Sequence, residues 1–459
     1  MNWTAISTSL ESWRARGQAV RMRTRRLRRR IAILLAVVGP GLIVSNVDND
    51  AGGIYTYSLA GAQFGYALLW SLIPMTFALY VTLEMCSRMG AVTGKGLSDL
   101  IREEFGFRVT FFIMAAVLLV NLGNVLAEFA GVASAMQIFG VSKYISVPLA
   151  AILVWGLVVA GTAARVEKIF LAICVVYLAY VASAVLAKPS WLEATLYLLP
   201  PHILEWIPKM KPFVEAPRID ASYLLILAAL VGTTIAPWQH FYLQAAVVEK
   251  RVGPRQYAHT RKDVLVGSIS CMLIVFFIIV CTAATLHASG HRHIGSAAEA
   301  AEALRPLAGR WASALFALGL LNASLFAASI LPLSTAYTIC EALGFESGID
   351  RKFSEAPIFY WLYTAMIAIG AGLILIPGAP LVRIAVLSQV ANSFLLPLIL
   401  ICMLLLVNRS DLMGNQVNSR GFNAVAWTTS IAMIVLTVVL LYTAVFRPGE
   451  ALGTHSGVP

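Results

Sequence analysis

The first long apolar segment of this sequence is broken near its middle by Ser45-Asn46-Val47-Asp48-Asn49-Asp50-Ala51-Gly52-Gly53. The sixth such segment is broken in the same way by Gly232-Thr233-Thr234-Ile235-Ala236-Pro237-Trp238-Gln239-His240. Each run puts polar or helix-breaking residues inside an apolar stretch, and each stands in the first of five consecutive segments. Paired interruptions at corresponding places in two halves indicate a substrate site near the middle of a membrane, where unwound backbone lines a cavity.

The composition places most of the chain in lipid. Its 459 residues are 59% hydrophobic and 12% charged, with a mean hydropathy of +0.79, whereas soluble domains carry about 25% charged residues. A spanning helix needs about 20 apolar residues, and about eleven candidate segments follow one another: 31–62, 66–86, 109–139, 144–161, 169–187, 223–248, 264–287, 311–341, 358–376, 381–407 and 422–446. We therefore expect an all-α, polytopic membrane protein with one transmembrane domain over residues 31–446.

The distribution of basic residues predicts the orientation. Nine arginines lie between Arg14 and Arg30. A basic run directly before a first spanning helix is typically held on the cytoplasmic side, so this interpretation is favoured over nucleic-acid binding. Alternate connections then lie inside and are also basic, with Lys95, Arg165, Lys168, Lys250, Arg251, Arg351, Lys352 and Arg409. The prediction is a cytoplasmic tail at 1–30, a short extracytoplasmic tail at 447–459, and a monomer in the lipid bilayer of the cell membrane.

Several kinds of chemistry find no support in the sequence. The six cysteines all lie in or beside apolar segments without a CxxC pair, which is typical of helix packing rather than of disulfides or zinc sites. Nucleotide-binding and nucleophile-elbow motifs are missing from the sequence. We expect neither an enzyme nor a bound cofactor.

Five ionisable or amide side chains within the apolar segments are candidate functional groups. A carboxylate in mid-membrane costs several kcal/mol, so it is rare without a role. Asp50 is interpreted as a cation ligand, with helix capping as the alternative. For Asp48 the two interpretations, cation ligand and helix cap, are equally favoured. Glu128 and His240 could form a proton route or a structural polar network. Gln389 could touch a hydrated ion or join two helices.

Short motifs spread over nearly the whole chain resemble those of the NRAMP divalent-metal transporter family. They are Gly39-Pro40-Gly41, Asp50-Ala51-Gly52-Gly53, Val92-Thr93-Gly94-Lys95, Leu126-Ala127-Glu128, Gly232-Thr233-Thr234-Ile235-Ala236-Pro237 and Val417-Asn418-Ser419-Arg420. The resemblance implies a LeuT-like fold of two inverted five-helix repeats plus an eleventh helix, with helices 1 and 6 broken.

The departures from the family pattern fall in the implied site. The family's first break usually reads Asp-Pro-Gly-Asn, and its Asp and Asn positions fall here on Asp50 and Gly53. Its sixth-helix carbonyl and methionine positions fall on Thr233 and Ala236, and its usual histidine falls on Trp238. Of three side-chain ligands only Asp50 is kept.

A site without its methionine has lost the soft ligand that favours transition metals. Mg²⁺ sheds water reluctantly and is usually held by one or two carboxylates with several waters retained. The pattern resembles the NRAMP-related magnesium transporter branch, so we expect a widened site and uptake of hydrated Mg²⁺ or Mn²⁺ as substrate, without proton coupling. The alternatives are a proton-coupled Mn²⁺/Fe²⁺ importer and a LeuT-fold amino-acid symporter.

Overall fold

The regular elements of the protein are helices. The computed structural model describes residues 39–161, 178–204, 206, 217, 219–295, 299 and 310–446, and within these ranges it contains no strand. The predicted tails at 1–30 and 447–459, the basic residues Arg165 and Lys168, and Cys174 lie outside the described residues. The five described cysteines are buried and free.

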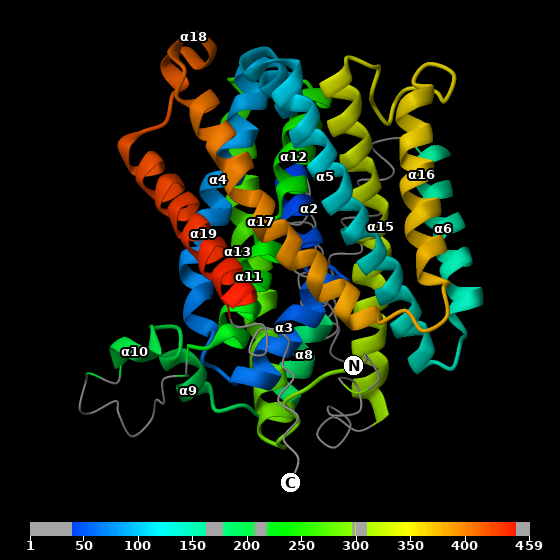
Figure 1. The fold of residues 1–459 in the computed structure, drawn as a ribbon, viewed down its shortest axis with the longest axis vertical. Helices are drawn as coiled ribbons and strands as arrows, with labels where there is room; N and C mark the ends of the chain where they lie inside the picture. The colour runs from blue at the N-terminus through cyan, green and yellow to red at the C-terminus, as the bar shows by residue number, and fades with distance from the viewer. Residues whose placement is uncertain are drawn as a thin grey trace, which may run out of the picture. The chain divides into compact units, whose positions relative to one another are not determined.

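The described helices account for all eleven predicted spanning segments (Figure 1). Eight are long and apolar enough to cross a membrane. The other three predicted segments correspond to the pair α2–α3, to the 17-residue α6, and to α8, whose predicted first half is not described. The elements are α2 (Pro40–Val47), α3 (Ala51–Phe64), η1 (Leu69–Ser71), α4 (Leu72–Thr93), α5 (Leu97–Ile138), α6 (Lys143–Val159), α8 (Leu178–Leu186), α9 (Trp191–Leu196), α10 (Pro201–Leu204), α11 (Ala221–Thr234), α12 (Pro237–Glu249), α13 (Tyr257–Thr282), η3 (Ala283–His287), α15 (Arg310–Leu343), α16 (Pro357–Ile374), α17 (Leu381–Val407), α18 (Ser410–Met413), η4 (Gly414–Gln416) and α19 (Arg420–Phe446).

Both predicted helix breaks are confirmed. The first leaves three residues between α2 and α3, and Asp50 adopts an extended conformation as the N-cap of α3. The second lies between α11 and α12, where Pro237 occupies the first turn of α12. Proline lacks a backbone N–H and fits the start of a helix, where that donor has no helical partner. The chain therefore stops and restarts a helix at each break.

The predicted end of the second spanning segment at Cys86 is wrong. Helix α4 continues to Thr93, because the charged residues that ended the apolar run are neutralised inside the protein. Glu84 and Arg88 form a buried ion pair at 3.1 Å, and Tyr257 donates to Glu84. A paired and hydrogen-bonded charge does not have to end a buried helix.

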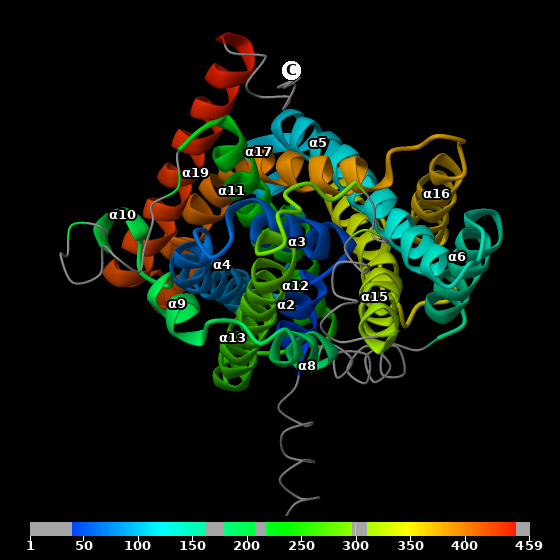
Figure 2. The same cartoon turned by 90° about the horizontal axis from the view of Figure 1, so that it is seen from below.

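The two broken helices lie in the interior of the helical bundle, as the view in Figure 2 shows. Helix α2 packs against α12 and α13, and α3 packs against α11, α13 and α17. Outside them, α5 contacts both α15 and α17. The arrangement encloses the ends of the four half-helices within other helices.

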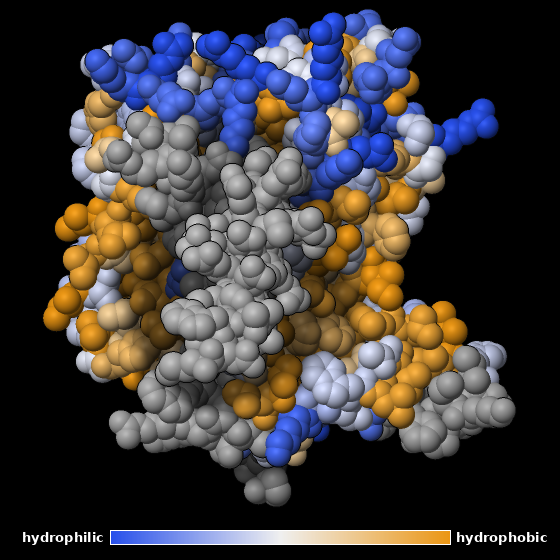
Figure 3. Space-filling view, turned by 180° about the vertical axis from the view of Figure 1, so that it is seen from behind, coloured by the Kyte–Doolittle hydropathy of each residue, from blue (hydrophilic) through white to orange (hydrophobic). Residues whose placement is uncertain are grey.

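The connections predicted to be basic and cytoplasmic gather at one end. The links α4–α5, α12–α13, α15–α16 and α17–α18 lie at the end of Figure 1 that carries α18, and hydrogen bonds join them, including Gln244 Nε2 to Lys95 O and Arg102 to Glu341 O. Hydrophilic residues cover this end in Figure 3, with apolar surface below it. The chain is a multi-pass membrane protein with a polar, basic end.

Candidate ion site between the two helix breaks

Asp50 holds its carboxylate at the positive end of a half-helix. It is 3% exposed, and its Oδ1 accepts a hydrogen bond from Gly53 N at 2.5 Å. The cap orients the carboxylate and the α3 dipole favours its negative charge. The helix-capping role that the sequence suggested for Asp50 is therefore present in the structure. The cap uses Oδ1, so it does not prevent the other carboxylate oxygen from taking a second role.

Glu128 lies at the same helix end. This fully buried residue of α5 accepts from Ala51 N through Oε2 at 3.2 Å, and Ala51 directly follows Asp50, the N-cap of α3. Its Oε1 has no partner among the described residues. Two carboxyl groups buried side by side need a proton or a cation to balance their charge. The geometry thus provides a place where positive charge is favoured.

Asp48 connects the two breaks. Its Oδ1 accepts from Gln239 Nε2 on α12, and its backbone oxygen accepts from Tyr57 Oη at 3.3 Å. In the described part of the chain, Asp48 Oδ2 and Gln239 Oε1 have no hydrogen-bond partner. Gln239 was not singled out from the sequence. The sequence feature that could have identified Gln239 is its position in the second break, in the first turn of the half-helix that begins at Pro237.

The structure also brings Gly53, Thr233 and Gln389 to the first break. A Cβ atom added to Gly53 would lie 3.0 Å from Thr233 Oγ1. A Cβ added to Gly52 would lie 1.9 Å from Gln389 Nε2. Ala236, which is 1% exposed, precedes α12 as its N-cap, and its carbonyl accepts from Gln239 N at 3.2 Å. The predicted residues thus lie on facing helix ends and on α17.

The widened pocket expected from the sequence is not found in this conformation. A Cβ added to Gly53 would also lie 2.5 Å from Asp48 O, so the space beside the two glycines is already filled by Asp48, Thr233 and Gln389. Glycine permits close helix approach, and in this structure the neighbouring elements lie close to both glycines.

At the breaks, the buried side-chain atoms without a hydrogen-bond partner among the described residues are oxygen atoms and the two ring nitrogens of His240. Within the described residues, no three His, Cys, Asp or Glu side chains form a cluster able to hold a metal ion. The buried oxygens without a partner include Asp48 Oδ2, Thr233 Oγ1 and Gln239 Oε1. Carboxylate, hydroxyl and amide oxygens suit hard cations such as Mg²⁺, Ca²⁺ and Mn²⁺. An ion here would be held by few protein ligands.

His240 is fully buried on α12, and neither ring nitrogen has a hydrogen-bond partner in the described part of the structure. No hydrogen bond there joins it to Asp48, Asp50 or Glu128. At the neighbouring Trp238, the backbone oxygen accepts from Ser334 Oγ at 2.9 Å. A proton route through Glu128 and His240 stays a prediction.

Gly232 is a point of close contact between α11 and α17, which allows a test of this packing. A Cβ atom at Gly232 would lie 2.0 Å from the backbone oxygen of Gln389. We expect Gly232→Ala to lower the free energy of unfolding by roughly 1–3 kcal/mol, because the backbones must separate. Gly156→Ala on α6 is the control, since a Cβ there meets no atom within 4 Å. The midpoint of thermal unfolding in detergent measures both variants, and an equal midpoint for the two would contradict the packing argument.

Comparison with known proteins assigns the chain to a family. The family described as natural resistance-associated macrophage protein-like (Nramp) matches residues 41–443. A protein of Deinococcus radiodurans named divalent metal cation transporter MntH is 26% identical over 430 residues, covering 89% of this chain and 90% of the relative. A protein of the same name from Burkholderia ambifaria is 26% identical over 427 residues, covering 90% of each.

Solved structures confirm the predicted fold. The structure of an Eremococcus coleocola manganese transporter with an aromatic bis-isothiourea compound is 20% identical, with a TM-score of 0.69 over 92% of each chain. Mhp1, a nucleobase-cation-symport-1 family transporter, is 14% identical, with a TM-score of 0.54 over 88% of this chain and 90% of Mhp1. The LeuT-like arrangement with two broken helices is therefore shared across distant sequences. Because the family match spans nearly all of the described helices, the chain is a member of the Nramp family.

Proposed function

We propose that this protein transports divalent metal ions into the cell, with Mg²⁺ as the main substrate and Mn²⁺ as the second. The metal ion is cargo, and the protein performs no catalysis. The observation that carries the proposal is the nature of the groups at the breaks. Asp50 and Asp48 offer carboxylates beside unpartnered hydroxyl and amide oxygens, and Ala236 contributes only a methyl group and backbone.

A largely hydrated ion requires the half-helices to separate. In the described conformation Gly52 and Gly53 are in close contact with Gln389 and Thr233, which leaves no space for a hydration shell. Opening these contacts would expose Asp50 and Asp48 to water together. Mg²⁺ would then keep most of its water ligands and bind through one or two carboxylates. Alternate opening toward the two sides of the membrane, with the ion site at the fixed centre, is the transport cycle expected for this fold.

The membrane potential is sufficient to drive the proposed uptake. One elementary charge gains about 2.3 kcal/mol per 100 mV, and a divalent ion gains roughly twice that. The family histidine position holds Trp238, and His240 has no hydrogen bond to the carboxyl groups within the described residues. We therefore propose uptake without proton coupling. The protein would act as a monomer in the cell membrane with its N-terminus in the cytoplasm.

Proton movement provides a direct test of this coupling. Proteoliposomes holding a pH-sensitive dye should show no acidification while Mg²⁺ or Mn²⁺ flows in under an imposed potential. The control is the same liposomes without protein, which should show neither ion influx nor acidification under the same potential. Stoichiometric acidification would instead support the proton-coupled Mn²⁺/Fe²⁺ importer.

The substrate is tested by flux of each ion into proteoliposomes with ion-sensitive dyes. Mg²⁺ influx with Mn²⁺ as a competing ion is the expected result. Mn²⁺ influx without Mg²⁺ influx would contradict the magnesium assignment and agree with the manganese transporters that share the fold. Flux of neither ion, together with uptake of amino acids, would replace the metal proposal by the symporter alternative.

A further inference from the structure

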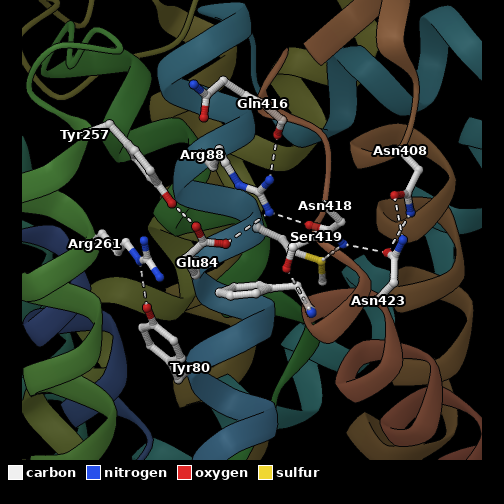
Figure 4. Close-up of polar contacts among 12 residues, drawn as sticks. Tyr80, Glu84, Arg88, Tyr257, Arg261, Asn408, Gln416, Asn418, Ser419 and Asn423 are labelled. Atoms are coloured by element: carbon white, nitrogen blue, oxygen red, sulfur yellow. Dashed lines mark hydrogen bonds and ion pairs between the residues drawn. The ribbon is translucent and has the colours of Figure 1, made fainter. Parts of the chain in front are cut away.

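A cavity whose lining includes several charged and polar side chains lies at the basic end of the molecule, away from the helix breaks. It has a volume of about 280 Å³ and lies between α4, the start of α13, and the segment that joins η4 to α19. Its lining includes Glu84, Arg88, Tyr257, Arg261, Ser419 and Phe422. Figure 4 shows these polar side chains converging from three parts of the chain.

Arg88 is held rigidly in the wall of this cavity. It is 6% exposed, and Nη1 donates to Gln416 O at 2.6 Å while Nη2 donates to Glu84 at 3.1 Å and also to Asn418. Its buried Nε–H has no partner among the described residues. A buried arginine donor left unmatched is costly. Arg88 therefore places a fixed positive charge in the cavity wall, with its Nε–H buried inside the protein.

Arg261 adds a second and freely accessible guanidinium. Its Nε donates to Tyr80 Oη at 3.0 Å, and its charge lies 5.8 Å from the centre of the Phe422 ring. The side chain is exposed, and no carboxylate of the described residues forms an ion pair with it. The only carboxylate in the lining, Glu84, is already engaged by Arg88 and Tyr257. Two guanidinium groups against one carboxylate leave an excess positive charge.

The cavity marks the boundary between polar and apolar surface. On α4, Phe77 is exposed, and on α13, Leu265 and Ile269 are exposed, each about one to two turns from a cavity residue. Exposed apolar side chains on spanning helices face lipid tails. The arginines thus stand at the level where phospholipid headgroups lie, with apolar surface beside them for acyl chains.

We propose that this cavity binds a phosphate group, supplied by the headgroup of an anionic phospholipid. The phosphate would accept from the exposed guanidinium of Arg261, with the Ser419 hydroxyl in the lining and the charge of Arg88 in the cavity wall. Arginine is well suited to phosphate because its planar donors match the oxygen geometry. Basic cavities between spanning helices at the cytoplasmic face are known to select anionic lipids. A soluble phosphate ion offers the same chemistry without the acyl chains.

The test uses the full-length purified protein in detergent, with phosphatidylglycerol, phosphatidylcholine or inorganic phosphate as probes. Native mass spectrometry counts bound lipid, and the midpoint of thermal unfolding follows the stabilisation. The variant is Arg261→Gln, because Arg261 is exposed and its loss should not disturb the fold. The matched control is Lys262→Gln, which removes the same charge from the next residue, outside the cavity lining.

We expect wild type to prefer phosphatidylglycerol over phosphatidylcholine, Arg261→Gln to weaken that binding about tenfold, and Lys262→Gln to change it less than about twofold. Inorganic phosphate should neither displace the lipid nor raise the unfolding midpoint. Displacement by inorganic phosphate would overturn the lipid source in favour of a soluble anion. Equal effects of the two variants would overturn the phosphate site itself, and equal binding of the two lipids would overturn the proposed selection of an anionic headgroup.

Discussion

Asp50→Asn is expected to reduce divalent-metal uptake by roughly 100-fold or more. Asparagine is as good a helix cap as aspartate, so the hydrogen bond from Gly53 N and the start of α3 should persist. The negative charge beside Glu128 is lost, however. Each factor of ten corresponds to about 1.4 kcal/mol, and a carboxylate facing a divalent ion at an effective dielectric constant of about 20 contributes several times that amount. The variant therefore separates the ligand role of Asp50 from its capping role.

The control for this variant is Asp220→Asn. Asp220 also caps a half-helix, since its Oδ1 accepts from Tyr223 N at 2.9 Å, but it is exposed at the outer start of α11. Dye-reported Mg²⁺ and Mn²⁺ influx into proteoliposomes should stay near the wild-type rate in this control. Near-normal uptake by a correctly folded Asp50→Asn protein would show that Asp50 serves only as a cap.

The sequence was sufficient to predict the places where the helices break. Asp48, Asn49 and Asp50 interrupt an apolar run with groups that compete with the helix, and Pro237 removes a donor at a helix start. These are local effects, so they predicted both breaks without knowledge of tertiary contacts, and the structure confirmed them. Apolar length likewise predicted α17 at 381–407, the same residues that the structure shows. The predicted end of the segment that forms α4 was wrong. The ion pair of Glu84 and Arg88 that lets the helix continue depends on partners from α13 and from the segment before α19.

The contacts inside the site could not be predicted in the same way. Gln239 bonds Asp48 across 191 positions of sequence, and nothing in the local pattern distinguishes it from a structural amide. The pairing of Gly52 with Gln389 reversed the expectation of a wide pocket. Small residues allow either a cavity or close packing, and the choice depends on how neighbouring helices settle. The residue types at the breaks could be seen in the sequence. The distances between the groups they carry could be known only from the folded structure.

Ala236→Met is expected to shift selectivity from Mg²⁺ toward Mn²⁺ by about tenfold or more in relative uptake rate. Ala236 is the N-cap of α12, the half-helix that follows the second break, and its side chain offers no atom that could coordinate a metal ion. A thioether placed there would add a soft ligand, which favours transition metals and does not favour Mg²⁺. It would also displace water from the ion, which costs Mg²⁺ more because it gives up water reluctantly. Both effects act in the same direction.

In that experiment, the effect of the larger side chain at position 236 has to be separated from the effect of its sulfur as a metal ligand. Ala236 is 1% exposed, so any larger side chain crowds the site. Ala236→Leu has nearly the same bulk as methionine without the sulfur, and it should lower the uptake of both ions without changing their ratio. Cys271→Ser tests the other sulfur near the breaks, since Cys271 Sγ accepts from Asn49 Nδ2 at 3.7 Å, and it too should leave the ratio unchanged. If Met and Leu at position 236 gave the same ratio of Mn²⁺ to Mg²⁺ uptake, selectivity would not depend on the missing thioether. The ion preference would then have to come from the oxygen ligands around Asp48 and Asp50, which all three proteins share.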